Sequence, residues 1–202
     1  MCHYSAETLK CQVIDWLIAN YPGVIIGNEV MYGTTRKVVD LLAIYSDKIW
    51  AIEIKSHDDN LKRLSGQLKE YRKIFDKTIV VTSSSHINES LLLIGNDVGL
   101  YSSDKTIKKV KPALSNHDFD KQEMLYSISS RYLKSRYPAY KSMNSDKLRT
   151  LLSKKSKSVI HELLVDFYRH RITERYKCFF NERGVYTHVD DIPVLSSFHV
   201  IE

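Results

Sequence analysis

Two apolar runs separated by a short polar turn constrain the fold of this chain more than any other feature. The first run, KVVDLLAIY, ends at Tyr45, and the second, KIWAIEIKS, begins at Lys48. Because the turn from Ser46 to Lys48 is so short, the two runs are predicted to pair as neighbouring strands of an antiparallel hairpin. We therefore expect a β-sheet built around this hairpin at the centre of the fold.

Two acids and a lysine interrupt the apolar pattern of this hairpin. Asp40 is the one acid of the first run. In the second run alternate residues share a face, so Glu53 and Lys55 stand side by side. A buried carboxylate is costly unless it is paired or bound to a cation. The hairpin can bring Asp40 and Glu53 together, and two hard oxygen ligands on neighbouring strands suit Mg²⁺ or Mn²⁺.

The order and spacing of these residues resemble a known signature. Asp40, an interval of twelve residues and then Glu53-Ile54-Lys55 is similar to the D…(D/E)-x-K signature of the PD-(D/E)XK nuclease superfamily. This is the only acid-x-Lys triplet in the chain, and it falls at the end of an apolar strand. The sequence departs from the pattern at one position, where Val39 rather than a proline precedes Asp40.

A second motif lies in the amphipathic helix predicted after the hairpin. Gln67 and Tyr71 resemble the Q-x-x-x-Y motif of the RecB-like branch of the superfamily. Four residues apart on a helix, they share a row at the border of its apolar stripe. From that position Gln67 can either hydrogen-bond a nucleotide or order the waters of a metal. The resemblance covers roughly residues 5–83 and is closest to the small stand-alone bacterial members.

The resemblance implies both a fold and a mechanism. It implies an αβββαβ restriction-endonuclease-like core in which Asp40, Glu53 and the main-chain carbonyl of Ile54 hold Mg²⁺ (or Mn²⁺). Lys55 would position the attacking water and steady the phosphorus centre, with Gln67 and Tyr71 completing the catalytic set. Products would carry a 5′-phosphate. The implied activity is Mg²⁺-dependent hydrolysis of DNA.

Further charged residues leave alternatives open. Glu29 is the one charge of a strand predicted at residues 24–32, and it is either a third metal-site acid or a partner of Arg36. Arg36 is itself a candidate partner of Glu29 or Asp40 and a candidate nucleic-acid contact. Glu7, on a first helix predicted to start at Ser5, either approaches the site or is a solvated first-turn acid.

The predicted fold class is α/β, a mixed β-sheet flanked by helices, followed by a mainly helical C-terminal region. Residues 1–112 are expected to form the nuclease-like domain and residues 113–202 the basic helical region. Beyond the hairpin and its helix, the patterns predict a strand at 77–82, a short helix at 90–95, a last edge strand at 99–103, and helices at 118–137, 145–153 and 159–176.

The basic surplus lies in the second half of the chain. Residues 1–100 carry a net charge of −1 and residues 101–202 a net charge of +7. This asymmetry favours a polyanion contact by the C-terminal region, although a solvated basic surface gives the same count. Candidate nucleic-acid contacts are Lys154, Lys155 and Lys157, together with Arg63 beside Gln67. The alternative function is a DNA-binding regulator, or a non-catalytic nuclease-fold module, acting through these helices.

Composition bears on whether the chain can fold in water and in which compartment we expect it. The apolar fraction is 43%, enough for a core, but the apolar runs are far shorter than a membrane span. Cys2, Cys11 and Cys178 have no metal-ligand spacing and favour a reducing cytoplasm. The expected partner is DNA and not a membrane, and a second copy of the chain is a further candidate.

Overall fold

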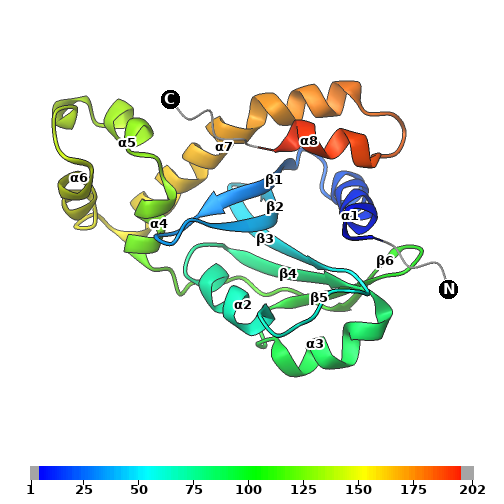
Figure 1. The fold of residues 1–202 in the computed structure, drawn as a ribbon. Coiled ribbons are helices and arrows are strands. Elements are labelled where there is room, and N and C mark those ends of the chain that lie inside the picture. Colours follow the sequence, from blue (N-terminus) through cyan, green and yellow to red (C-terminus); the bar gives the residue numbers. More distant parts are fainter. Residues whose placement is uncertain (1–4, 197–202) are drawn as a thin grey trace.

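A six-stranded mixed sheet forms the centre of the protein, which a computed structural model describes over residues 5–196. Cys2 lies outside these residues. The strands follow one another across the sheet in chain order (Figure 1). The central pairs β3–β4 and β4–β5 are parallel, and the other neighbours are antiparallel. The strands are β1 (Ile25–Tyr32), β2 (Lys37–Tyr45), β3 (Lys48–Lys55), β4 (Lys77–Thr82), β5 (Gly99–Ser103) and β6 (Ile107–Lys111).

Helices cover both faces of this sheet, so the predicted α/β class and the order helix, three strands, helix, strand are confirmed. The first helix begins as predicted, because the side chain of Ser5 accepts a hydrogen bond from the backbone N–H of Thr8. The α-helices are α1 (Ala6–Asn20), α2 (Leu64–Arg72), α3 (Ile87–Leu93), α4 (Lys121–Ser127), α5 (Ser130–Arg136), α6 (Ser145–Leu152), α7 (Lys157–Glu182) and α8 (Ile192–Leu195). Short 3₁₀ turns lie at Ser84–His86, Pro138–Tyr140 and Val189–Asp191.

The hairpin turn fixes the register of β2 against β3. Ser46 and Asp47 have φ angles of 48° and 57°. Two consecutive left-handed residues are typical of a two-residue type I′ turn, whose twist matches that of paired strands. The resulting register places Leu41 opposite Ile52. The predicted hairpin is therefore confirmed.

The sheet separates two apolar cores. Ile52 and Ile54 of β3 pack with residues of α1 and α8, two helices that lie on one face of the sheet in Figure 1. Ala51 lies in the core of the other face, which also contains buried residues of α2, α4, α6 and α7. This second core joins Tyr32 of the hairpin-bearing half to Ile172 of the C-terminal region. The alternation predicted for β3 is thus observed, and Glu53 and Lys55 fall on the α2 face.

The alternation of β1 and β2 breaks at one step. Ile26 and Leu41 pack on the α1 face, whereas Val30 and Val39 pack on the α2 face. In regular strands Ile26 would share a face with Val30, and Leu41 with Val39. The break coincides with Glu29, whose φ of 51° is left-handed. In the β1–β2 register, Asp40 is the residue that lies opposite Glu29.

Two expectations for the second half of the chain are wrong. The expected edge strand at Gly99–Ser103 is internal, because β6 pairs beyond it. A helix predicted at 118–137 is broken into α4 and α5. Ser129 accepts from the N–H of Tyr132 and begins a new helix, while Ser127 Oγ accepts from Gly33 N at 2.8 Å. A contact with a turn 94 positions away therefore competes with helix continuation.

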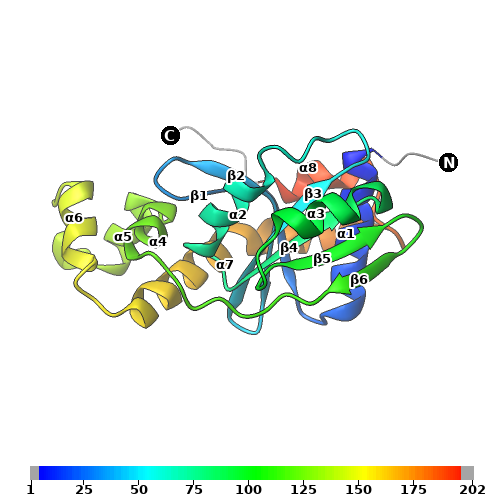
Figure 2. The same ribbon diagram turned by 90° about the horizontal axis from the view of Figure 1, so that it is seen from below.

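The C-terminal helices extend from the β1 side of the sheet. Figures 1 and 2 show α4, α5 and α6 gathered beside β1, away from β5 and β6. The long helix α7 packs along β1 and against α4. Its His161 Nε2 lies 2.9 Å from Asp76 Oδ2, at the start of β4. Among residues 5–196, no helix is both long and apolar enough to cross a bilayer.

Candidate functional site

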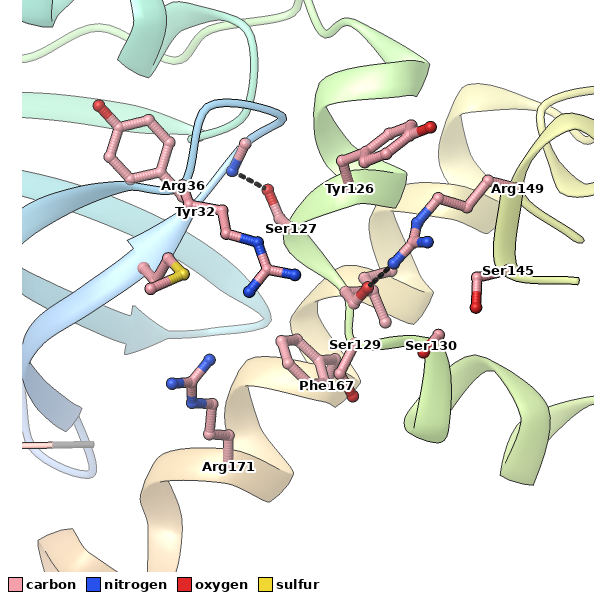
Figure 3. A pocket seen from close by; sticks show the side chains of 13 residues that line it. Tyr32, Arg36, Tyr126, Ser127, Ser129, Ser130, Ser145, Arg149, Phe167 and Arg171 are labelled. Carbon is pink, nitrogen blue, oxygen red and sulfur yellow. Dashed lines mark hydrogen bonds between the residues drawn. The ribbon is translucent and has the colours of Figure 1, made fainter. Parts of the chain in front are cut away.

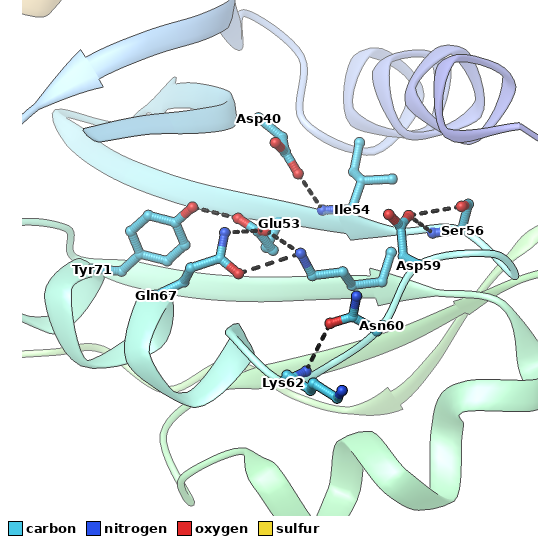
Figure 4. Close-up of polar contacts among 10 residues, drawn as sticks. Asp40, Glu53, Ile54, Ser56, Asp59, Asn60, Lys62, Gln67 and Tyr71 are labelled. Atoms are coloured by element: carbon cyan, nitrogen blue, oxygen red, sulfur yellow. Dashed lines mark hydrogen bonds and ion pairs between the residues drawn. The ribbon is translucent and has the colours of Figure 1, made fainter. Parts of the chain in front are cut away.

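The register of the hairpin brings the two predicted acids together. Leu41 pairs with Ile52, so the next step places Asp40 opposite Glu53 on the neighbouring strand. Asp40 Oδ2 accepts a hydrogen bond of 2.8 Å from the backbone N–H of Ile54 (Figure 4). This bond fixes one carboxylate oxygen of Asp40 beside the strand that carries Glu53 and Lys55.

Glu53 is the centre of a buried polar network. Its side chain is 2% exposed, and Oε1 accepts from Lys55 Nζ at 2.7 Å and from Gln67 Nε2 at 2.6 Å. Its second oxygen, Oε2, accepts from the hydroxyl of Tyr71. Lys55 Nζ also lies 3.3 Å from Gln67 Oε1. β3 and α2 supply these four groups, and Figure 4 shows Gln67 and Tyr71 of α2 directed toward Glu53. With Asp40 of β2 beside Glu53, the predicted catalytic residues converge.

The helix α2 positions Gln67 and Tyr71 by burying its apolar side. Leu64 and Leu68 are buried under the sheet, which turns the row containing Gln67 and Tyr71 toward Glu53. Before the helix, Asp59 Oδ2 accepts from the N–H and the hydroxyl of Ser56, both at 2.7 Å. This local turn leads the chain out of β3 directly after Lys55.

Burial and the charge of Glu53 change the protonation of two neighbouring groups, Asp40 and Tyr71. Burial, and then the negative charge of Glu53, raise the pKa of Asp40 to about 6. The N–H of Ile54 and the cations of Lys10 and Lys55 act in the opposite direction. Burial, followed by the charge of Glu53, raises the pKa of Tyr71 far above its usual range. Tyr71 therefore stays protonated and can only donate to the Glu53 carboxylate.

The donor set fits a hard divalent cation. Asp40 and Glu53 offer carboxylate oxygens, and the main chain of Ile54 adds a carbonyl next to them. Within residues 5–196 no cluster of three or more His, Cys, Asp and Glu side chains could hold a metal ion. Mg²⁺ is commonly held by one or two carboxylates together with waters and substrate phosphates. Two adjacent acids are too few for a closed zinc site, but they are a number of carboxylates with which Mg²⁺ or Mn²⁺ is commonly held.

Glu29 and Glu7 are not brought into this network. The Glu29 side chain is 57% exposed and lies 3.5 Å from Lys10 rather than beside Arg36. Glu7 is exposed on α1. Lys10 was not predicted, because it lies in α1, 30 positions before Asp40. Its side chain is only 12% exposed, and an unusually buried lysine that acts on Asp40 and Glu29 is visible only in three dimensions.

A basic groove adjoins the acid network. A cavity of about 470 Å³ is bordered by Gln67 and by Tyr32, whose ring centroid lies 5.4 Å from that of Tyr71. Arg63, one of the predicted nucleic-acid contacts, lines this cavity together with Lys37 and Lys62. Lys37 was not predicted, although as the first residue of β2 it precedes Asp40 by three positions. We call these three cations the groove residues.

The remaining predicted nucleic-acid contacts lie elsewhere. Arg36 is exposed in the turn between β1 and β2, where its φ is 51°, and it borders a different cavity. Lys154, Lys155 and Lys157 are exposed at the turn between α6 and α7. Figure 1 shows this yellow turn among the C-terminal helices rather than beside α2 and β3. The structure therefore does not bring these three lysines to the acids.

Comparisons with known proteins give a family but no reaction. The chain matches the family described as Bacteriophage P4 protein cII over residues 3–196. It is 33% identical to Protein cII of Enterobacteria phage P4 over 96 residues, which cover 46% of this chain and 36% of that protein. The match thus spans about a third of the curated relative. A solved structure of a protein of unknown function from Silicibacter pomeroyi is similar at 17% identity and a TM-score of 0.46, covering 69% of this chain and 96% of that one.

Proposed function

We propose that this chain, which belongs to the bacteriophage P4 protein cII family, is a metal-dependent nuclease that hydrolyses DNA phosphodiester bonds. One observation carries the proposal. Glu53 is buried beside Asp40 on the neighbouring strand, and Lys55 lies 2.7 Å from its carboxylate. The arrangement supports the resemblance of these residues to the PD-(D/E)XK signature, because the register places the two acids opposite each other on neighbouring strands and Lys55 contacts Glu53.

In this proposal each polar group has one task. Asp40, Glu53 and the Ile54 carbonyl hold Mg²⁺ or Mn²⁺, which lowers the pKa of a bound water and neutralises phosphate charge. Lys55 orients the attacking water and balances negative charge on the phosphate. In the free protein its ammonium instead satisfies Glu53, so the buried acid has a counter-charge before substrate arrives.

Gln67 and Tyr71 position these groups. Tyr71 holds one oxygen of Glu53, and Gln67 donates to the other while its carbonyl accepts from Lys55. Because both residues lie on a helix rather than on a loop, they hold Glu53 and Lys55 in a fixed orientation. The groove residues next to Gln67 supply cations for the backbone of a DNA strand that reaches the acids.

The polar network around Glu53 favours this proposal over a regulator that acts through the C-terminal helices. Such a regulator would need neither the paired acids nor Lys55, because replacing buried charges by apolar residues is often neutral or stabilising. The side chains of Ile160, Leu164, Tyr168 and Ile172 are buried along α7, which lies against β1 and α4, so a regulator would have to contact DNA through the exposed side of this helix.

A cleavage assay tests the proposal. We expect the parent protein to cut linear, circular, single-stranded or branched DNA with Mg²⁺ and not with a chelator. Asp40→Asn keeps the shape of the side chain but removes a metal ligand, so it should lose Mg²⁺-dependent cleavage while remaining folded. Glu162→Gln, at an exposed position of α7, is the matched control and should cut normally. Cleavage by Asp40→Asn at the parent rate would refute the assignment.

A further inference from the structure

A glycine stands inside α2 where neither the backbone nor the packing requires one. Gly66 is the third residue of this helix and directly precedes Gln67. Its φ is not left-handed, and a Cβ at this position would meet no atom within 4 Å beyond the adjacent backbone of the helix. Glycine is unfavourable inside a helix, because it loses more conformational freedom on folding than any other residue. The protein therefore keeps a destabilising residue where the fold itself would accept alanine.

The open side of Gly66 belongs to the wall of the basic groove beside the acids. Gly66 lines the cavity of about 470 Å³ next to Gln67. Gln67 in turn donates to the Glu53 carboxylate at 2.6 Å, and Figure 4 shows its side chain directed toward that carboxylate. Glycine is typical of places where a backbone comes close to a ligand. A ligand in the groove can thus reach the bare backbone of α2 one residue before the side chain that positions Glu53.

The rest of the lining suits a nucleotide. None of the residues that line this cavity is an aspartate or a glutamate. The groove residues are exposed, and within residues 5–196 their side chains form no ion pair or hydrogen bond, so all three cations are available to a phosphate. Val38, which is 46% exposed, and the ring of Tyr32 add apolar surface to the same lining. A positively charged groove that also offers apolar side chains is the kind of site that binds a single strand.

The cations come from two separate elements that border the cavity. Lys37 begins β2, whereas Lys62 and Arg63 precede the first residue of α2. Each nucleotide inside a strand has a phosphate on either side, but a free mononucleotide has phosphate at one end only. A strand that passes between the two elements therefore uses all three cations. The cavity volume lies within the range of pockets that hold one small ligand, so it accommodates about one nucleotide of that strand.

We propose that the basic groove holds one strand of DNA with its sugar–phosphate backbone against Gly66, so that the missing side chain lets the strand come close to Gln67 and the acids. This inference rests on the proposed nuclease function and names the part of the substrate that the groove takes. Gly66 has no group that reacts or carries charge. Its contribution is the space that it leaves, and a side chain at this position displaces the strand.

Substitution of Gly66 by larger residues tests this inference. The affinity for a fluorescent single-stranded oligonucleotide is measured in the presence of a chelator, and urea denaturation is followed on the same proteins. Gly66→Ala should raise the urea midpoint, because alanine favours the helix and its Cβ has room, yet it should lower the affinity. Gly66→Leu should lower the affinity about tenfold or more, the size of effect expected when an added side chain overfills a packed site. A loss of affinity together with a gain in stability cannot come from misfolding.

Gly184 supplies the matched control. It is also exposed, a Cβ there would meet only the carbonyl oxygen of Tyr186, at 3.8 Å, beyond its chain neighbours, and it lies outside the lining of the groove. Gly184→Leu therefore adds the same side chain elsewhere and should bind the oligonucleotide as the parent does. A loss of affinity in Gly184→Leu equal to that in Gly66→Leu would overturn the inference.

The outcomes separate this inference from the proposed function. Because binding is measured without metal, a parent that never cleaves DNA but loses affinity in Gly66→Leu would contradict only the nuclease proposal. A parent that cleaves DNA and keeps its affinity in Gly66→Leu would overturn only the inference. A nucleoside monophosphate is the second probe, and we expect it to bind far more weakly than the strand. If it bound as tightly as the strand and lost as much affinity in Gly66→Leu, the groove would be a site for a free nucleotide, which also overturns the inference.

Discussion

The acid network lies near a second cavity, which is lined by Arg36, Arg149 and Arg171 (Figure 3) and which we call the arginine cavity, but the two are assembled in opposite ways. Asp40, Glu53, Lys55, Gln67 and Tyr71 all come from one hairpin and the helix after it, within 32 consecutive positions. The arginine cavity joins a turn at Arg36 to α7 at Arg171, 135 positions later. The first site is a product of local register, and the second is a product of long-range packing.

This difference suggests different sensitivities. A site made by strand register changes only if the sheet changes, because a slip by one residue would turn every side chain to the other face. A site between packed helices depends on contacts such as Gly33 to Ser127 and can shift when those contacts loosen. The proposed chemistry should therefore depend on the hairpin and be less sensitive to changes in the C-terminal helices.

The largest expected effect is that of Lys55→Met. The change keeps the aliphatic stem and removes the charge that lies 2.7 Å from Glu53. Cleavage should fall roughly a hundredfold or more, the range for losing one preorganised electrostatic group. Single-turnover rates with saturating DNA would measure it, and Lys69→Met, at an exposed position of α2, is the control. Full activity would mean that Glu53-Ile54-Lys55 matches the nuclease signature by chance.

A smaller effect is expected for Tyr71→Phe. The ring keeps its packing on Tyr32 and Phe75, but Glu53 Oε2 loses its donor. A buried acceptor left without a partner costs about 1–3 kcal/mol, so urea denaturation should show a loss of that order. Cleavage should fall about tenfold, in line with a misplaced rather than a missing ligand. If stability and rate were both unchanged, Tyr71 would only fill space.

Most of the acid network could be predicted from the sequence, whereas its surroundings could not. Asp40 and Glu53 meet because a two-residue turn fixes the register between two apolar strands, and both strands and turn are local signals. The face change at Glu29 was not predictable from alternation, since it depends on one left-handed residue. This turn of the backbone explains why Glu29 pairs with Lys10 in solvent contact instead of joining the acids.

The two errors described above, at the edge strand and at the broken helix, have different physical origins. The sequence IKKVK of β6 lacks an apolar face, because an edge strand needs little burial and its lysines prevent edge-to-edge association. The break between α4 and α5 follows from Ser129, a strong helix N-cap that lies inside an otherwise helical pattern. Pattern analysis favours one long helix in such a segment. Only the tertiary contact of Ser127 with Gly33 shows where it ends.

A matched pair of triple variants compares the two basic regions in DNA binding. Changing the groove residues, Lys37, Lys62 and Arg63, to Gln should lower affinity and reduce the salt dependence by up to about 0.9 logarithmic units for each phosphate that is no longer neutralised. The same change at Lys154, Lys155 and Lys157 removes equal charge from the α6–α7 turn and should have a smaller effect. Because both variants weaken uniform binding, saturating DNA should restore turnover in each. A larger fall in affinity in the second variant would place the main DNA-binding surface on the C-terminal helices.

The smallest expected effect concerns pH and Mg²⁺, and it follows from Asp40. Its pKa in the folded protein is raised to about 6 by burial and by Glu53, above its value in the unfolded chain. Protonated Asp40 therefore stabilises the metal-free fold relative to ionised Asp40. This stabilisation is fully present below about pH 4 and is lost as pH rises through about 6. Mg²⁺ binds the ionised carboxylate of Asp40, so the stabilisation that Mg²⁺ provides should grow as pH rises through about 6.

Thermal unfolding with and without Mg²⁺ at several pH values measures this effect. We expect the gain in melting temperature from Mg²⁺ to increase by a few degrees between about pH 5 and about pH 7, as a free-energy change of about 1 kcal/mol produces in a chain of this size. In Asp40→Asn the gain should be small at every pH, because the titrating ligand is gone. Glu29→Gln should follow the parent, because its side chain is exposed beside Lys10 and outside the network. A pH-dependent Mg²⁺ gain that is lost in Glu29→Gln and kept in Asp40→Asn would move the metal from β2–β3 to the β1 side of the sheet.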